Sequence, residues 1–163
     1  MDKDKIKDIV KQKFTEYLSA KRCRKTPERY AILDSIYSHS GHFSMDALYE
    51  YLNTYHFRVS RATIYNTIQL LIDCKLVIKH QLGNNSSYYE KAYNNDLHHH
   101  LVCTHCGNIR DYKSNELEIP VLNKKIKQFI PSFYKLYIFG TCKKCNTALK
   151  KETAKSLEKT KKK

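Results

Sequence analysis

His98-His-His-Leu-Val-Cys-Thr-His-Cys-Gly107 ends in a C-x-x-C motif, and Cys142-Lys-Lys-Cys145 supplies a second one. Each motif can present two thiolates from a tight turn, and four thiolates complete a tetrahedral shell around one zinc ion. The interval between the motifs is longer than the roughly 15–20 residues of a compact zinc ribbon, so a small subdomain must lie between them. Redox-active pairs are the alternative, but two pairs flanking a strand-rich segment favour a closed, structural zinc site held by Cys103, Cys106, Cys142 and Cys145.

Short strand-forming runs surround these cysteines. The sequence predicts strands at 98–102, 109–112 and 133–139, with one helix from about 117 to 130. This pattern indicates a small α/β domain. The lysine-rich segment that follows is expected to be disordered. Cys23 and Cys74 have no C-x-x-C partner and are expected to be small buried residues.

The N-terminal half reads as four helices and a hairpin. Apolar residues recur at helical spacing from Lys5 to Ala20. Thr26-Pro27, Ser44 and Ser60 begin the next three helices, since Thr and Ser are good N-caps and Pro suits the first helical position. A Gly/Asn-rich loop, 83–87, then separates two apolar runs and predicts a hairpin. Helices followed by a hairpin describe a winged helix-turn-helix.

The predicted fold class is therefore α+β, an N-terminal winged helix-turn-helix followed by a small α/β domain with a four-cysteine zinc site. The predicted parts are a winged-helix domain at 1–92, a hinge at 93–97, the α/β domain at 98–149 and a basic tail at 150–163.

The charge of the chain favours a polyanionic partner. Lys and Arg number 30 against 16 Asp and Glu, a formal net charge of +14. Such a field attracts nucleic acid or an anionic membrane surface, and nucleic acid fits the winged helix better. No apolar run reaches the ~18 residues of a membrane span, and the N-terminus lacks the apolar stretch of a signal peptide. We therefore expect no membrane partner and a cytoplasmic protein, in which six cysteines do not form a disulfide framework.

A histidine run precedes the first C-x-x-C motif. In a strand, His98 and His100 lie on one face and His99 lies on the other. Asp111 lies on the next predicted strand, where a hairpin would bring its carboxylate beside that pair. A three-histidine run alone is often a solvated patch, but the neighbouring carboxylate and cysteines favour a metal site.

The helix that begins at Ser60 is the candidate for reading DNA. Ala62, Tyr65, Asn66 and Gln69 share one arc, while apolar residues occupy another. Tyr65 would touch thymine methyls, and Asn66 or Gln69 would bond adenine edges. A solvated face is the alternative, which the net charge and the hairpin argue against. The candidate DNA-binding residues are Arg29, Ser60, Arg61, Thr63, Tyr65, Asn66 and Gln69, with the arginines holding phosphates.

Several motifs, in order along about residues 10–147, resemble the ferric uptake regulator (Fur) superfamily. They are Thr26-Pro-Glu-Arg29, Ala62-Thr-Ile-Tyr65, Tyr89-Glu90, the run from His98 to Gly107 and Cys142-x-x-Cys145. The resemblance implies a homodimeric repressor that binds DNA when a sensing metal is loaded, with the α/β domain forming the dimer. A symmetric dimer in turn implies a palindromic operator in double-stranded DNA.

The resemblance also implies a regulatory metal site that takes ligands from both domains. Its ligands are His42, Glu90, His98, His100 and Asp111. This nitrogen and oxygen shell suits Fe(II), Mn(II) or Zn(II), and we expect Fe(II) or Mn(II). A second site, present in some family members, would use His99 and Glu118, but Leu97 and Tyr134 replace two of its usual histidines. His99 is therefore expected to face outward. The zinc-sensing branch commonly uses a sensing cysteine, which is absent between Cys74 and Cys103.

The sequence is compatible with four functions, which differ in how well its residues support them. Asp111 stands where iron sensors more often carry Glu, and Tyr65-Asn66 and Asn84-Asn-Ser-Ser87 resemble the peroxide-sensing branch. The sequence thus predicts a repressor that senses peroxide through bound Fe(II), with an iron-responsive regulator as the alternative. A zinc-stabilised nucleic-acid binder without sensing is more remote. A hydrolytic metalloenzyme is disfavoured, because the chain has no H-E-x-x-H motif or nucleophile–base pair.

Overall fold

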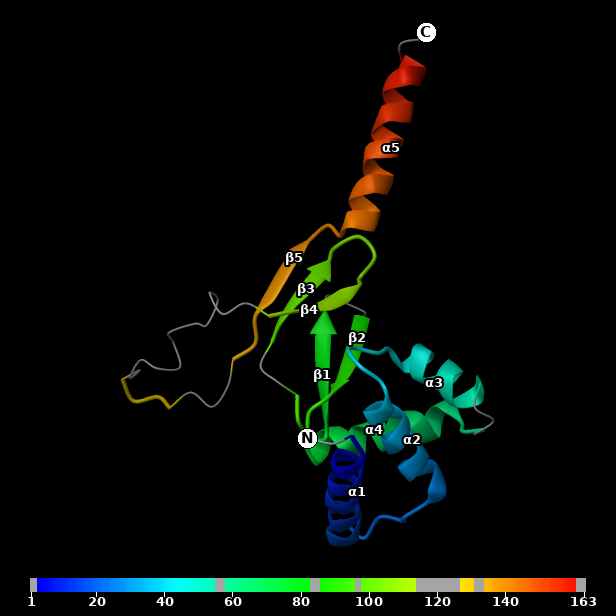
Figure 1. The fold of residues 1–163 in the computed structure, drawn as a ribbon, viewed down its shortest axis with the longest axis vertical. Helices are drawn as coiled ribbons and strands as arrows, with labels where there is room; N and C mark the ends of the chain where they lie inside the picture. The colour runs from blue at the N-terminus through cyan, green and yellow to red at the C-terminus, as the bar shows by residue number, and fades with distance from the viewer. Residues whose placement is uncertain are drawn as a thin grey trace. The chain divides into compact units, whose positions relative to one another are not determined.

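The computed structural model describes residues 3–54, 58–82, 86–95, 98–113, 127–130 and 134–160. The chain divides into two compact units, Met1–Asp96 and Leu97–Lys163. This division falls within the segment 93–97 that the sequence marks as a hinge. The elements shown in Figure 1 are, in order, α1 (Lys3–Ala20), α2 (Pro27–Ser38), α3 (Met45–Thr54), α4 (Arg61–Asp73), β1 (Val77–Leu82), β2 (Ser86–Lys91), β3 (His99–Cys103), β4 (Ile109–Tyr112), β5 (Tyr137–Gly140) and α5 (Lys143–Thr160).

The first unit is a helical bundle that carries a hairpin. Helix α2 packs against α1, α3 and α4 (Figure 1). Val10, Phe14 and Leu18 recur every four residues along α1 and are buried, so one stripe of that helix faces the core. The predicted caps at Ser44 and Ser60 are confirmed: their Oγ atoms accept the amide N–H groups three residues later, each at 3.1 Å.

The start of α2 is capped differently. Thr26 occupies the N-cap position with extended backbone, and its side chain makes no capping hydrogen bond. Pro27 nevertheless begins the helix, as predicted, because its fixed φ suits the first helical position.

The hairpin β1–β2 is antiparallel, with Val77 opposite Lys91 and Leu82 opposite Ser86. A third segment joins it, since Phe43 and Tyr89 exchange both backbone hydrogen bonds at 2.9 Å. The loop before α3 is thereby pinned to β2. Four helices and this hairpin confirm the predicted winged helix-turn-helix.

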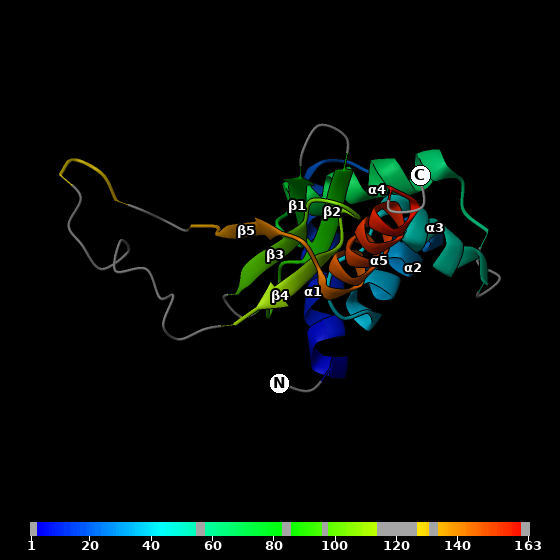
Figure 2. The same ribbon diagram turned by 90° about the horizontal axis from the view of Figure 1, so that it is seen from above.

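The second unit contains a three-stranded sheet in the order β4-β3-β5 (Figure 2). The central strand β3 is antiparallel to β4 and parallel to β5. Parallel strands end at the same edge of a sheet, so the carboxyl ends of β3 and β5 lie together. Thr104 N–H donates to the Gly140 carbonyl at 2.8 Å, which joins the two segments just beyond the strands.

Three details of the second unit differ from the sequence-based expectations. The strand expected at 133–139 begins only at Tyr137. The expected helix at 117–130 lies mostly outside the described residues, and 127–130 are not helical. The tail from Lys150, expected to be disordered, continues α5 to Thr160. Ala, Leu, Lys and Glu dominate this segment, and their high helix propensity outweighs the self-repulsion that the expectation relied on.

Candidate functional site

The cysteines of both C-x-x-C motifs form one cluster in the second unit. The Sγ atoms of Cys103, Cys106, Cys142 and Cys145 all lie within 4.8 Å of one another. Zinc–sulfur bonds of about 2.3 Å in a tetrahedron place sulfurs about 3.8 Å apart. The Cys106 and Cys142 sulfurs are 3.9 Å apart, so the cluster already has the dimensions of a zinc–thiolate shell.

Backbone geometry explains how the motifs meet. Cys103 ends β3, and Gly107, at φ +69°, turns the chain into β4. Cys142 lies just after β5, at the same edge of the sheet, and opens α5. Because the two parallel strands end together, their following turns converge.

The pKa values of two thiols in the cluster are shifted in opposite directions. The backbone N–H of Cys142 donates to Cys103 Sγ at 3.3 Å, and this contact is the main cause that lowers the pKa of Cys103 to about 6. Hydrogen bonds with Cys142 and Cys106 raise the pKa of Cys145 to about 12. A bound cation would remove this difference in pKa between the thiols, because it stabilises all four thiolates at once. The cluster is consistent with structural zinc.

A second cluster lies inside the first unit. Glu90 is buried on β2, with His42 Nε2 3.5 Å from its Oε2 and His80 Nε2 2.7 Å from its Oε1. The rings of His42 and His80 lie 5.1 Å apart at 70°. Two imidazoles and a carboxylate are a ligand set for Fe, Mn or Zn, and this cluster is consistent with a regulatory metal.

The fold places these side chains for definable reasons. Gly41 adopts φ +79°, a conformation that favours glycine, and turns the chain just before His42. The bridge between Phe43 and Tyr89 then sets His42 beside Glu90, the next residue along β2. His80 faces the same side of the hairpin as Glu90, because the register pairs Ile78 with Glu90 and strand faces alternate.

Sequence reasoning missed His80, which is only 1% exposed. One signal could have found it, since His80 lies an even number of residues from Ile78 and Leu82 and so shares the inward face of an apolar strand. A polar residue on the inward face of a strand is buried, and a buried polar side chain normally has a hydrogen-bond partner or a ligand.

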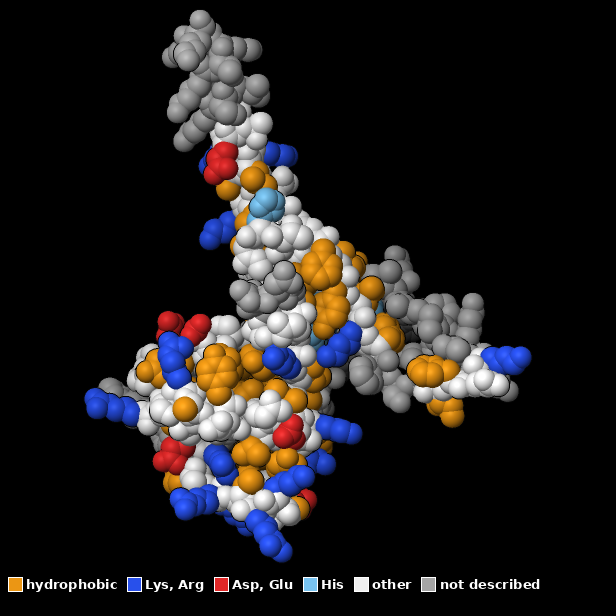
Figure 3. Space-filling model, turned by 180° about the vertical axis from the view of Figure 1, so that it is seen from behind, with side chains coloured by type: hydrophobic (Ala, Val, Ile, Leu, Met, Phe, Trp, Pro, Cys, Tyr) orange, Lys and Arg blue, Asp and Glu red, His pale blue; other side chains and the backbone are white. Residues whose placement is uncertain are grey.

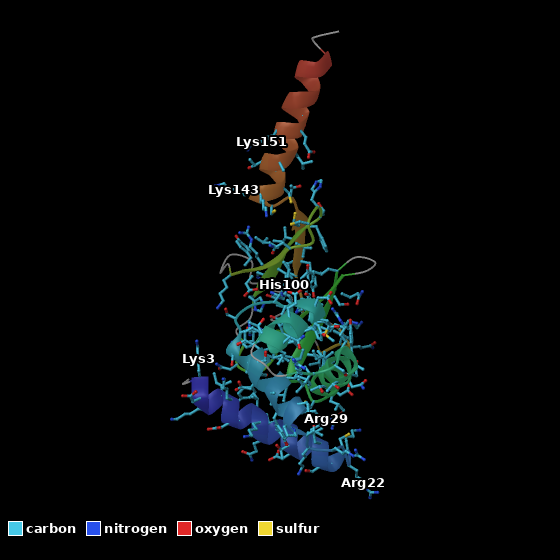
Figure 4. The ribbon with its side chains drawn as sticks, turned by 90° about the vertical axis from the view of Figure 1, so that its right-hand side faces the viewer. Lys3, Arg22, Arg29, His100, Lys143 and Lys151 are labelled. Carbon is cyan, nitrogen blue, oxygen red and sulfur yellow. The ribbon has the colours of Figure 1, made fainter. Side chains whose placement is uncertain are left out.

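The second unit holds the other predicted ligands. His98 Nε2 lies 3.8 Å from Asp111 Oδ1, and the His98 and His100 rings are 4.7 Å apart. His100 also stacks on Tyr137, with ring centroids 5.0 Å apart. The register opposes His100 to Asp111, so the predicted side-by-side arrangement of these three residues is found. Figure 4 labels His100 on the sheet of this unit.

The expectation for His99 is wrong. This residue does not face outward but is 4% exposed, and its ring lies 6.1 Å from that of Tyr134. The reverse face of β3 is covered, a tertiary effect that strand alternation alone does not reveal. Glu118, its expected companion in a second metal site, lies outside the described residues.

The candidate DNA-reading helix is α4. Tyr65 is 53% exposed, and Ala62, Asn66 and Gln69 are exposed on the same side. Ile64, Ile68 and Leu71 are buried in the core. The two arcs expected from the sequence are thus found, and the polar arc is open to a ligand.

A basic hollow of about 480 Å³ lies at the beginning of α4, with Arg24, Arg29, Arg58, Ser60 and Thr63 among its lining residues. Arg29 extends from the first turn of α2 (Figure 4). Lys and Arg side chains also stand out around the first unit in the face drawn in Figure 3. The sequence reasoning named Arg29 but not Arg24 or Arg58, whose neighbourhood depends on the fold.

Arg61 has a partner within the protein. Its guanidinium forms an ion pair with Asp46 on α3, and its Cζ lies 4.4 Å from the centre of the Tyr49 ring. Both members of the ion pair are more than half exposed. To hold a DNA phosphate as expected, Arg61 must therefore give up its ion pair with Asp46.

Among the described residues, no helix combines the length and the apolar character needed to cross a bilayer.

The chain is similar to ferric uptake regulators and to peroxide-responsive repressors. The model of the Ferric uptake regulator family matches residues 4–132. The peroxide-responsive repressor PerR of Staphylococcus aureus is 33% identical over 123 residues, which cover 75% of this chain and 82% of that protein. The structure resembles that of the Helicobacter pylori ferric uptake regulator Fur, with a TM-score of 0.72, 18% identity and coverage of 90% of this chain and 95% of that one.

It also resembles the Campylobacter jejuni peroxide stress regulator, with a TM-score of 0.60, 26% identity and coverage of 85% of this chain and 97% of that one. The family match covers most of the chain, and the PerR relative matches three quarters of it. On this evidence the chain belongs to the ferric uptake regulator family.

Proposed function

We propose that this protein is a homodimeric repressor that binds a palindromic operator when Fe(II) or Mn(II) is loaded, and that hydrogen peroxide inactivates its Fe(II) form. As a member of the ferric uptake regulator family, the protein is a metal-dependent transcription factor and not an enzyme. The metal, the signal and the operator are the parts proposed.

The observation that carries the proposal is the pair of ligand clusters, of which all members except Asp111 have enclosed side chains. His42 and Glu90 meet in the first unit, and His98, His100 and Asp111 gather in the second. The five residues are those that the family resemblance assigns to one regulatory ion. A metal bound by both groups would couple the DNA-reading unit to the other unit, so DNA affinity would follow metal loading.

Family members bind operator DNA, typically as dimers. Support for a dimer of this chain comes from the second unit, where Ile138 and Phe139 on β5 are 39% and 58% exposed. They border an open hollow of about 660 Å³ that Leu101 also lines. An exposed apolar strand at a sheet edge is normally covered, and a second copy of the chain would cover it.

Peroxide sensing is supported by the similarity to PerR and by Asp111. Bound Fe(II) would supply the one-electron chemistry that cleaves the O–O bond of peroxide, and it would regain that electron from the oxidised imidazole. The histidines that hold the ion are the nearest oxidisable groups, and His42 and His100 are the best candidates. In the net reaction, one peroxide oxygen is added to an imidazole carbon and the other leaves as water.

The test compares the Fe(II) and Mn(II) forms under the same dose of peroxide, prepared without oxygen. We expect the Fe(II) form to lose operator binding and to gain one oxygen on a peptide that contains His42 or His100. The Mn(II) form should keep its DNA affinity, because Mn(II) does not reduce peroxide in this way. Gel-shift titration and peptide mass spectrometry provide the two measurements.

Other outcomes would select the other functions. Full operator binding by the Fe(II) form after peroxide favours the plain iron sensor, for which metal release is the only signal. Oxidation confined to Cys103, Cys106, Cys142 or Cys145 indicates thiol damage. Operator affinity that does not change with chelator or added metal would identify a nucleic-acid binder without sensing.

A further inference from the structure

His80 is the one buried residue of the first-unit cluster that the proposed regulatory shell does not use. Its imidazole Nε2 lies 2.7 Å from Glu90 Oε1, and both side chains are almost completely enclosed. The inference drawn from this contact rests on the proposed function, because it concerns how Glu90 serves the regulatory ion.

The hydrogen bonds of Glu90 are divided between its two oxygens. Oε1 contacts His80, while Oε2 accepts the Asn95 amide at 2.9 Å and lies 3.5 Å from His42 Nε2. A carboxylate that binds a metal is ionised and only accepts hydrogen bonds, so with the ion bound His80 Nε2 is the donor of this contact. A nitrogen that donates this hydrogen bond has no lone pair left for a metal.

We propose that His80 is a positioning residue that holds Glu90 as a one-oxygen ligand of the regulatory metal. The His80 hydrogen bond fixes Oε1 toward His80 and turns Oε2 toward His42. Oε2 also accepts the Asn95 amide, and its second lone pair would bind the ion. Glu90 then fills a single coordination position instead of two. Mutation of a residue that orients a metal ligand in this way typically lowers metal affinity by about 10- to 100-fold.

Two other roles make different predictions. If His80 ligates the ion itself, any residue without an imidazole at this position should lose affinity and alter the coordination geometry. If His80 only fills space beneath the hairpin, an apolar residue of similar size should serve equally well. The conservative variant His80→Gln separates these roles, because its amide N–H reaches about as far as Nε2 but is a poor ligand.

The experiment uses the full-length protein with structural zinc in place and Mn(II) as the probe. We expect His80→Leu to weaken Mn(II) binding by about 10- to 100-fold and His80→Gln to restore it to within a few-fold of wild type. The absorption spectrum of Co(II) in the same site should be unchanged in His80→Gln. His39→Gln and His39→Leu are matched controls, since His39 is a half-buried histidine of the same unit whose Nδ1 contacts the Ser35 carbonyl. Both His39 variants should bind Mn(II) as wild type does.

Loss of affinity in His80→Gln with an altered Co(II) spectrum would overturn the proposal in favour of a direct ligand. Wild-type affinity in His80→Leu would overturn it in favour of a core residue. Should His80→Leu unfold, His80→Asn replaces it, because its shorter amide cannot reach Oε1 and should lose affinity only if the hydrogen bond matters. His98→Ala tests the proposed function separately: if it keeps wild-type Mn(II) affinity, the regulatory shell has been assigned wrongly, whatever His80 does.

Discussion

Cys142 illustrates how one residue can support a whole domain. It contributes Sγ to the four-cysteine cluster, and its backbone N–H donates to Cys103. We expect Cys142→Ser to lose zinc and most of the dimer together, because an incomplete thiolate shell forfeits the folding free energy that the ion supplies. Zinc analysis and sedimentation measure the two effects.

Cys74→Ser is the matched control for that variant. Cys74 belongs to the other unit and is half-buried beside the core, where burial raises the pKa of its thiol to about 11. This control should keep its zinc and its dimer. A stable, zinc-loaded dimer of Cys142→Ser would refute the assignment of the cluster.

Tyr37 joins α2 to both ends of the hairpin. Its hydroxyl donates to the Leu76 carbonyl at 2.8 Å and accepts the Tyr93 N–H at 3.2 Å. Tyr37→Phe removes this hydroxyl and leaves the buried Leu76 carbonyl and the half-buried Tyr93 N–H without it, so the free energy of unfolding should fall by about 1–3 kcal/mol. Urea denaturation near neutral pH provides the measurement, and an unchanged midpoint would show that water replaces the hydroxyl.

The same residue predicts an alkaline effect. Burial raises the pKa of Tyr37 to about 12, above the value of about 10 expected in the unfolded chain. The stabilisation from the neutral phenol is therefore complete below about pH 10 and is lost as pH rises toward 12. The stability difference between wild type and Tyr37→Phe should narrow over that range.

At the scale of elements, α4 is the helix whose exposed arc we expect to read DNA. Tyr65→Ala should abolish or relax operator preference while leaving weak, salt-sensitive binding, because neutralisation of phosphates by basic residues does not depend on sequence. Competition between operator and random DNA measures the preference. Undiminished discrimination in this variant would remove α4 from the major groove.

Arg61 predicts a different effect at the start of the same helix. Its exposed ion pair with Asp46 is worth little in water, so phosphate can compete for the guanidinium. Asp46→Asn should free Arg61, strengthen binding to random DNA more than to operator, and steepen the salt dependence by about 0.9 in log–log slope. Asp34→Asn is the control, because it removes the same charge from α2, where Asp34 pairs with Lys7. Equal effects of the two variants would show that Arg61 is not restrained by Asp46.

The elements also differ in how well the sequence predicts them. The caps at Ser44 and Ser60, the buried stripe of α1 and the hairpin follow from local spacing, and all were predicted correctly. The start of β5 and the burial of His99 depend on what packs nearby, so local patterns missed them. His80 was overlooked because its contact with Glu90 depends on the register in which β1 and β2 pair, which the sequence did not reveal.

At the scale of the whole molecule, the four cysteines and the two ligand groups show what the order of motifs can predict. Cys103 and Cys142 are far apart in sequence, yet paired C-x-x-C motifs predicted their common cluster, which the structure confirms. Strand alternation predicted the part of the regulatory shell formed by His98, His100 and Asp111, whereas His42 and Glu90 were added only by the family resemblance. The assembly of this shell around one ion stays a prediction.

That assembly can be tested through the boundary between the units. The chain divides between Asp96 and Leu97, and the proposed ligands lie on both sides of this point. A metal that binds His42 and Glu90 together with His98 and His100 would restrain the connection, so Mn(II) should slow cleavage before Asp96 by an aspartate-specific protease. His98→Ala removes one proposed ligand while leaving the cleaved sequence unchanged, and it should be cut at the same rate with and without Mn(II). Both proteins are digested by the same protease at the same Mn(II) concentration. Any effect of Mn(II) on the protease itself is therefore equal for the two proteins and does not change their relative cleavage rates. Equal protection of both proteins would mean that Mn(II) acts elsewhere, and the two units would then not be coupled through these residues.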